Sequence, residues 1–317
     1  MMKNLRVGVI GVGYLGQFHA EKYAGMPGVE LVGVVDADPA RAALIAKKQN
    51  TRPFSGPDQL LGLVDAVNIV VPTAYHHQVA KRFLGQGVHV LLEKPITVTL
   101  EQADELIELA NRKGLILQIG HIERFNPAVT AVKALLKSPR YITAERAAPF
   151  TVRCTDVNVV LDLMIHDLDI VSDFAGSEPK EVSAAGASVI TNEIDMATAR
   201  IVFHNGCAAD VTASRVSDEK KRFLRVFDEE SVYASDYQTQ KASVSIKGGN
   251  AVPELIMSSI PTERLDTLQE EIRAFVRSIQ TGSRPLVSGI EGRRALALAR
   301  RISENIHKGI KGFVAVE

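Results

Sequence analysis

The first third of the chain alternates short apolar runs with longer segments in which apolar residues recur at helical spacing. The apolar runs predict strands at residues 5–10, 30–35, 66–71, 88–92 and 115–119. The segments between them predict helices at residues 14–23, 39–48, 75–85 and 100–112. Short strands that are apolar on both faces and alternate with helices indicate a parallel sheet with right-handed crossovers and helices on both faces.

The pattern changes near Gly120. Beyond it, strands without intervening helices are predicted at residues 182–190, 197–203, 208–214, 223–227 and 243–246. Another strand is predicted at 141–147, and helices at 160–174, 265–280 and 289–307. Strands that follow one another directly favour a mainly antiparallel sheet. The sequence therefore predicts two domains of different architecture, with a boundary near residues 120–125.

Size and composition agree with this division. The 317 residues suggest two domains at roughly 100–200 residues each. The 37 basic residues balance the 37 acidic ones, so no charge excess indicates a nucleic-acid or membrane partner. Cys154 and Cys207 are too few for a disulfide framework, and neither a signal core nor a transmembrane-length apolar stretch is present. We therefore expect a soluble, cytoplasmic protein.

A glycine-rich loop follows the first predicted strand and opens the first predicted helix. It reads G-x-G-x-x-G, with Gly11 suited to a tight turn, Gly13 to close approach of a pyrophosphate and Gly16 to close packing of helix on strand. The amides of the helix start, including those of Tyr14 and Leu15, would face the anion with partial positive charge. The loop predicts a dinucleotide site in a Rossmann domain. The alternative is a glycine turn in an α/β domain that binds no nucleotide.

An acidic residue stands where such a site needs one. Asp36 ends the second predicted strand, 20 residues after Gly16, and can accept hydrogen bonds from the adenosine ribose. A carboxylate there would repel a 2′-phosphate, so NAD is favoured over NADP. Arg41 acts in the opposite sense, because a nearby arginine can accommodate that phosphate.

Two groups of titratable residues are candidates for catalysis. Glu93, Lys94 and Pro95 follow the fourth predicted strand, at the sheet edge where ligands of α/β sheets bind, and Lys94 could stabilise a developing oxyanion. Asp162 and His166 share one face of the predicted helix, so the carboxylate could orient an imidazole that takes a proton. The alternatives are a solvated Glu–Lys pair and a helix cap beside a structural histidine. No further ligands stand at metal-site spacing, so no metal is expected.

Two polar segments are candidates for binding. Residues 72–77 follow the third strand and could line the nicotinamide ribose, or could simply stop the strand and begin a helix. Residues 120–127 lie at the domain boundary, where they could form a substrate cleft or a polar hinge. The expected contacts are Pro72, Thr73 and His76 with Glu93 and Lys94 to the cofactor, and Arg124, Phe125 and Asn126 to the substrate.

Taken in order, these motifs resemble the glucose–fructose oxidoreductase, inositol dehydrogenase and MocA family (Gfo/Idh/MocA) over nearly the whole chain. The motifs are the glycine loop with His19, Val35-Asp36, residues 72–76, Glu93-Lys94-Pro95 and residues 162–166. The resemblance implies a doubly wound Rossmann domain in residues 1–121. It also implies an α+β domain in residues 122–317, with a large, mostly antiparallel sheet whose open face commonly builds homodimers and homotetramers. It assigns Lys94 as the catalytic lysine, Asp162 and His166 as the Asp–His pair, and His166 as the proton acceptor.

The segment G-H-I-E-R-F-N-P at residues 120–127 resembles bacterial members that oxidise C3 of UDP-N-acetylglucosamine. Those enzymes supply an aminotransferase in lipid A or surface-glycan synthesis. A nucleotide sugar needs cations for its diphosphate, for which Arg124, Arg153 and Arg215 are candidates. The alternatives are dehydrogenation of a free sugar, a cyclitol or a pyrrole pigment, a non-catalytic NAD-binding sensor, and a structural oligomer.

Overall fold

A computed structural model describes residues 4–152, 157–248 and 254–314 of the chain. The chain divides into two compact units, which are described separately. The first unit is Met1–Ile122 with Asp266–Arg293, and the second is Glu123–Leu265 with Arg294–Glu317.

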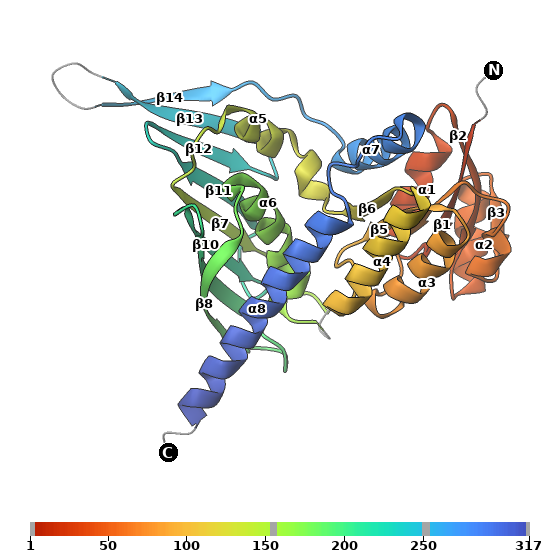
Figure 1. Cartoon of the computed structure of the whole chain (residues 1–317), viewed down its shortest axis with the longest axis horizontal. Coiled ribbons are helices and arrows are strands. Elements are labelled where there is room, and N and C mark those ends of the chain that lie inside the picture. Colours follow the sequence, from red (N-terminus) through yellow and green to blue (C-terminus); the bar gives the residue numbers. More distant parts are fainter. Residues whose placement is uncertain (1–3, 153–156, 249–253, 315–317) are drawn as a thin grey trace. The chain divides into compact units, whose positions relative to one another are not determined.

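The first unit is built on a six-stranded parallel sheet with the strand order β3-β2-β1-β4-β5-β6. The strands are β1 (Leu5–Ile10), β2 (Val29–Val35), β3 (Arg52–Phe54), β4 (Ala66–Ile69), β5 (His89–Glu93) and β6 (Leu117–Gly120). The helices α1 (Gly16–Ala24), α2 (Pro39–Lys48), α3 (Thr73–Gly85) and α4 (Leu100–Lys113) connect them (Figure 1). This order defines the Rossmann fold and confirms the predicted doubly wound sheet. Each element predicted for residues 5–119 is present with its ends within two residues, whereas β3 was not predicted.

Helix α7 (Thr267–Thr281) also packs in the first unit, together with the first turn of α8 (Gly289–Val314). Phe275 and Ile272 of α7 are fully buried in a cluster with Val7 and Val9 of β1. The sequence interpretation places these residues in the domain of residues 122–317, so the structure differs there. The difference arises because an amphipathic pattern shows that a helix has an apolar face without showing which sheet that face covers.

The second unit is built on an eight-stranded sheet with the order β14-β13-β12-β11-β7-β10-β9-β8. Among the described strands of this sheet, only β7 and β10 pair in parallel, so the sheet is mostly antiparallel, as predicted. The strands are β7 (Tyr141–Ala147), β8 (Pro179–Ala187), β9 (Met196–Phe203), β10 (Ala208–Ser214), β11 (Lys221–Phe227), β12 (Ser231–Asp236), β13 (Lys241–Gly248) and β14 (Glu254–Ile260). Strands β12 and β14 and helix α5 (Pro127–Leu135) were not predicted.

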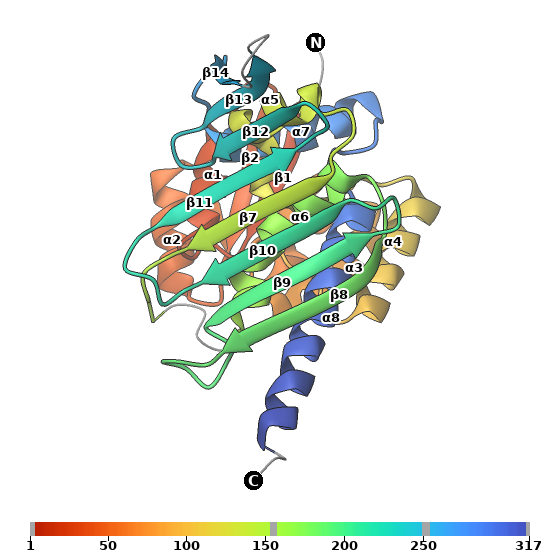
Figure 2. The same ribbon diagram turned by 90° about the vertical axis from the view of Figure 1, so that its left-hand side faces the viewer.

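One face of this sheet forms the core of the second unit. Helices α5, α6 (Ile165–Ala175) and α8 lie on that face (Figure 1), and Figure 2 looks onto the opposite face with these helices behind the strands. The alternation within β7 shows the two environments, because Ile142 and Ala144 are buried whereas Thr143 and Glu145 are partly exposed. The large sheet therefore keeps one apolar face inside and one polar face outside.

Candidate active site and cofactor cradle

The glycine loop has the geometry of a dinucleotide cradle. Gly11 has φ +86°, and a Cβ atom on it would lie 2.5 Å from the carbonyl oxygen of Val70. A Cβ atom on Gly16 would lie 1.8 Å from the carbonyl oxygen of Gly11, so α1 approaches the loop as closely as backbone permits. At Gly13 the nearest atom to such a Cβ is Arg41 Nη1, 4.0 Å away, which leaves the backbone open to a ligand. The loop therefore fits a bound pyrophosphate at the start of α1.

The side chains of the predicted cradle residues Tyr14 and Leu15 are exposed, at 61% and 46%. They lie on the turn between β1 and α1, ahead of the first residue of that helix. Their backbone amides therefore stand at the start of α1, where the sequence interpretation expects them to face an anion.

Asp36 connects the end of β2 to the glycine loop. Its Oδ2 accepts a hydrogen bond from the Val12 amide at 2.9 Å, and its Oδ1 accepts one from the Asp38 amide at 2.9 Å. Arg41 lies 3.6 Å from Asp36 and 3.7 Å from Asp38. The guanidinium predicted to favour a 2′-phosphate therefore faces two carboxylates, which is the arrangement expected for an NAD site.

Within residues 72–77, His76 is placed differently from the prediction. Helix α3 begins at Thr73, with Pro72 at the N-cap position and no side-chain capping bond. His76 is 1% exposed, and its ring nitrogens lie 2.8 Å from the carbonyl oxygens of Pro95 and Val71. His76 therefore joins the loop after β4 to the loop after β5 instead of presenting its ring to a cofactor. Burial lowers the pKa of His76 against the opposing effect of these carbonyls.

Lys94 follows β5, and the Lys94–Pro95 peptide is cis. The preceding Glu93 was predicted to contact the cofactor, but its carboxylate is only 15% exposed and points to protein groups. It lies 3.3 Å from His19 Nε2 and accepts a hydrogen bond from the Lys94 amide at 3.2 Å. Burial raises the pKa of Glu93, but the hydrogen bond and charge of His19, with the charge of Lys94, more than offset this and hold the pKa below its ordinary value.

Asp162 and His166 lie on either side of a change in helical geometry. Residues Val160–Met164 form a π-turn, and α6 begins directly after it, so the predicted helix of residues 160–174 is two elements. Asp162 lies in the π-turn and His166 in the first turn of α6, and both are half-buried. Single π-turns often occur at functional sites.

A buried ionic cluster fixes the start of α6, at the residue that follows His166. We define the Arg146 cluster as Arg146, Asp167, Glu123, Arg222 and Tyr237. Arg146 donates to both oxygens of the fully buried Asp167, at 2.6 and 3.2 Å, and to Glu123 at 3.2 Å. Arg222 also donates to Glu123, at 3.4 Å, and the Arg146 guanidinium lies 5.6 Å from the centre of the Tyr237 ring. Burial raises the pKa of Asp167 even though Arg146 acts to lower it.

The predicted substrate contacts at residues 124–126 are largely internal. Arg124 Nη2 lies 3.0 Å from Asp173, its Nη1 lies 3.5 Å from Asp169, and its side chain is 7% exposed. Asn126 is buried and caps α5 through the Ala128 amide, whereas Phe125 is half-buried. The sequence signal for the internal role of Arg124 was the pair of acidic residues four positions apart on α6.

Arg215, another predicted cation for the diphosphate, also contacts protein groups. Arg215 is 4% exposed and donates to Asp195 at 2.8 Å and to the Val157 carbonyl at 2.6 Å. Arg153 lies outside the described residues.

Within the described ranges, no group of His, Cys, Asp and Glu side chains could hold a metal ion. In the same part of the chain, no helix has the length and apolar character needed to cross a membrane.

Comparisons with known proteins agree with this architecture. Residues 5–121 match the oxidoreductase family with the NAD-binding Rossmann fold, and residues 129–233 match the Gfo/Idh/MocA C-terminal domain. The chain is 41% identical to UDP-N-acetylglucosamine 3-dehydrogenase from Acidithiobacillus ferrooxidans over 305 residues, covering 95% of this chain and 97% of that protein. A solved structure of that enzyme has a TM-score of 0.91 over 96% of this chain and 98% of its own. The scyllo-inositol 2-dehydrogenase (NAD(+)) of Bacillus subtilis is 27% identical over 332 residues, covering 98% of this chain and 96% of that protein.

The fold and the cradle are those of an NAD-dependent oxidoreductase. The chain belongs to the Gfo/Idh/MocA family, which confirms the resemblance found in its motifs.

Proposed function

We propose that this enzyme oxidises the C3 hydroxyl of a UDP-N-acetylhexosamine, most specifically UDP-N-acetylglucosamine, with NAD⁺ as oxidant. The observation that carries the proposal is the placement of Lys94 beside the cradle. Gly11 follows β1 and Lys94 follows β5, and these parallel strands flank β4. At ~4.8 Å between neighbouring strands, the two strand ends lie roughly 10 Å apart on the same edge of the sheet. The 41% identity to a UDP-N-acetylglucosamine 3-dehydrogenase supports the choice of substrate.

Three side chains perform the chemistry in this proposal. The glycine loop of Gly11, Gly13 and Gly16 would hold NAD⁺, which would supply the hydride acceptor for the carbon-bound hydrogen. The Lys94 ammonium donates a hydrogen bond to the substrate oxygen and stabilises its alkoxide character as the ketone forms. The His166 imidazole accepts the hydroxyl proton, and Asp162 orients the ring. The 3-keto sugar nucleotide is a suitable substrate for an aminotransferase, as in lipid A or surface-glycan synthesis. In this proposal the reaction takes place in the cytoplasm.

The proposal is tested by the steady-state rate of NADH formation with UDP-N-acetylglucosamine. Lys94→Ala and His166→Ala should each lower turnover by at least ~10²-fold, the scale of a lost positioned acid or base. The matched controls are Lys81→Ala, on the outer part of α3, and His204→Ala, in an exposed turn. Near-normal turnover in both site variants contradicts the roles of Lys94 and His166.

A substrate panel tests the sugar. The inositol dehydrogenases among the relatives make inositol the competing substrate. Oxidation of UDP-N-acetylglucosamine with little oxidation of inositol is the expected result. Oxidation of inositol alone would contradict the choice of nucleotide sugar and leave the catalytic residues unaffected.

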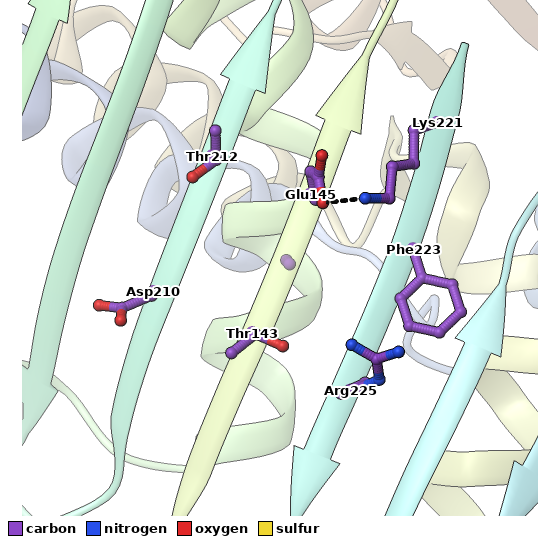
Figure 3. A pocket seen from close by; sticks show the side chains of 8 residues that line it. Thr143, Glu145, Asp210, Thr212, Lys221, Phe223 and Arg225 are labelled. Carbon is purple, nitrogen blue, oxygen red and sulfur yellow. Dashed lines mark ion pairs between the residues drawn. The ribbon is translucent and has the colours of Figure 1, made fainter. Parts of the chain in front are cut away.

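The open face of the large sheet supports assembly into a homodimer or homotetramer. A hollow of about 490 Å³ on this face is lined by residues of β7, β10 and β11. Figure 3 shows the side chains that line it. Glu145 and Lys221 pair there at 2.5 Å, and Asp210, Arg225 and the Phe223 ring lie around them. A surface with both charges and an aromatic ring can complement a second copy of itself. Phe223→Glu should convert the oligomer to a monomer in light scattering, and a monomeric wild-type protein would contradict this part of the proposal.

A further inference from the structure

The proposed mechanism leaves unused a buried acid–base pair directly behind Lys94. His19 on α1 is 3% exposed at its side chain, and its Nε2 lies 3.3 Å from Glu93 Oε1. Its Nδ1 lies 2.7 Å from Asn68 Oδ1 on β4. A histidine and a carboxylate taken out of water in this way cost free energy unless each is paired and hydrogen-bonded.

The hydrogen-bond network assigns the protons of His19. The amide nitrogen of Asn68 donates to the Leu91 carbonyl at 3.3 Å, so its oxygen is the acceptor that faces His19 Nδ1. Nδ1 of His19 therefore carries a proton. Nε2 faces Oε1 of the Glu93 carboxylate, which accepts hydrogen bonds through its lone pairs. Each ring nitrogen of His19 therefore faces an oxygen, and Glu93 has one further oxygen available.

That second oxygen reaches the catalytic loop. Glu93 Oε2 accepts the hydrogen bond of the Lys94 backbone amide at 3.2 Å. On the other side, a Cβ atom at Gly120 of β6 would lie 3.0 Å from the Glu93 carboxyl atoms, so the carboxylate occupies space that only glycine leaves there. The carboxylate is therefore clamped between α1, β6 and the backbone of Lys94.

The surrounding charges agree with an ionised Glu93. Glu271 on α7 is fully buried, and its two carboxyl oxygens have no hydrogen-bond partner among the described residues. Burial, and then the charge of Glu93, raise the pKa of Glu271 well above its ordinary value, which favours the neutral form of Glu271. The charge of Lys94 acts to lower the pKa of Glu93, and the charge of Glu93 acts to raise the pKa of the buried His76 on α3.

We propose that Asn68, His19 and Glu93 form a positioning chain that holds the backbone of Lys94, and through it the catalytic ammonium, at the edge of the sheet. The inference rests on the proposed role of Lys94. Glu93 and His19 touch neither the substrate nor the cofactor in this account, and they act only through Lys94. The loop after β5 carries a flexible side chain, and a displacement of about 1 Å at such a site can cost about 10²-fold in rate.

A double-mutant cycle with Lys94→Ala tests the chain. Glu93→Gln should lower kcat by about 10-fold to 10²-fold. The Kd for NAD⁺ should stay within about 2-fold of the wild-type value. In the Lys94→Ala background the same substitution should cause no further loss of kcat, because the group that it positions is gone. The matched control is His89→Gln at the opposite end of β5, where Nδ1 accepts the Ile116 amide at 3.0 Å and no change in kcat is expected.

A second pair of variants keeps the test independent of the folding of Glu93→Gln. His19→Gln retains an amide donor toward Glu93 and should keep most of kcat, whereas His19→Leu should lose as much as Glu93→Gln. Circular dichroism and NAD⁺ binding confirm that each variant is folded, and His19→Leu replaces Glu93→Gln in the cycle if the latter does not fold.

The outcomes separate the two proposals. If Lys94→Ala retains its turnover, the proposed function of Lys94 fails, whatever Glu93→Gln does. If Lys94→Ala loses turnover but Glu93→Gln loses equally in both backgrounds, Glu93 acts independently of Lys94 and the positioning chain is refuted. Unchanged kcat in both Glu93→Gln and His19→Leu also refutes it.

Discussion

Replacing Arg146 by leucine would test how the second unit holds the helix that carries His166. The substitution removes the partner of Asp167, which has no exposed surface, and one partner of Glu123, whose side chain is 8% exposed. Glu123 keeps Arg222 and Asn126, whereas Asp167 loses the hydrogen bonds to both of its oxygens and keeps the weaker effect of the Arg222 charge. Breaking a buried pair from one side costs about 3–5 kcal/mol. For a unit of this size, at about 2–4 °C per kcal/mol, Tm should fall by roughly 6–20 °C.

The pH dependence of the loss identifies its cause. Without Arg146, the pKa of Asp167, already raised by burial, rises further because the guanidinium that lowers it is gone. A carboxyl whose pKa is raised in the folded state contributes stability at low pH and loses that contribution as pH increases. The deficit of Arg146→Leu relative to wild type should therefore be larger at pH 8 than at pH 5.

The measurement is thermal unfolding at both pH values with two further variants. Arg140→Leu breaks an exposed pair with Glu229 in the same unit and should shift Tm by less than about 2 °C. Arg146→Leu combined with Asp167→Leu should recover most of the loss, since an apolar pair can replace a buried ion pair at little cost. A Tm of Arg146→Leu within about 2 °C of wild type, or an equal deficit at both pH values, would refute the reasoning.

Three further predictions follow from single sites. Gly16→Ala places a methyl group against the Gly11 carbonyl, so the Kd for NAD⁺ in calorimetric titration should rise at least about 10-fold; an unchanged Kd would show that the loop relaxes freely. Asp36→Ser removes a carboxylate that repels a 2′-phosphate and faces Arg41, so the ratio of kcat/KM with NADP to kcat/KM with NAD should rise about 10-fold or more. An unchanged ratio would show that Asp36 does not select between the two cofactors. Glu271 has a raised folded-state pKa, so wild type loses stability as pH rises above the ordinary value of 4.5; Glu271→Gln should melt higher than wild type at pH 8 and show no such gain near pH 4, and a pH-independent difference would contradict this.

All the described strands of the parallel sheet except β3 were predictable, because their signals are local. Each of its apolar runs is long enough to show a strand buried on both faces, and the glycine loop reports its own turn through steric demands at Gly11 and Gly16. Strand β14 escaped prediction because all but one of its residues are exposed, so it lacks the apolar alternation of a half-buried strand. The π-turn at Val160–Met164 escaped because its residues have the composition of an ordinary helix.

The candidate site was predictable in its residue types and less so in its contacts. Lys94 lies at the strand end where the sequence placed it, and its proposed role follows from that position. His76, Glu93 and Arg124 were expected to face ligands, yet the structure commits each of them to protein partners. A charged residue after a strand looks the same in sequence whether it serves a ligand or a neighbour.

The amino-acid sequence by itself determined the alternation of strands and helices, the glycine cradle and the order of the motifs, since each depends on residues close together in the chain. The tertiary structure decided which sheet α7 covers, and which carboxylate each buried cation meets. Those partners are far apart in sequence, as Arg124 and Asp169 are by 45 residues. Such pairings depend on the burial of whole elements against one another; local spacing can show that two carboxylates share a helix face, but it does not show which cation they meet.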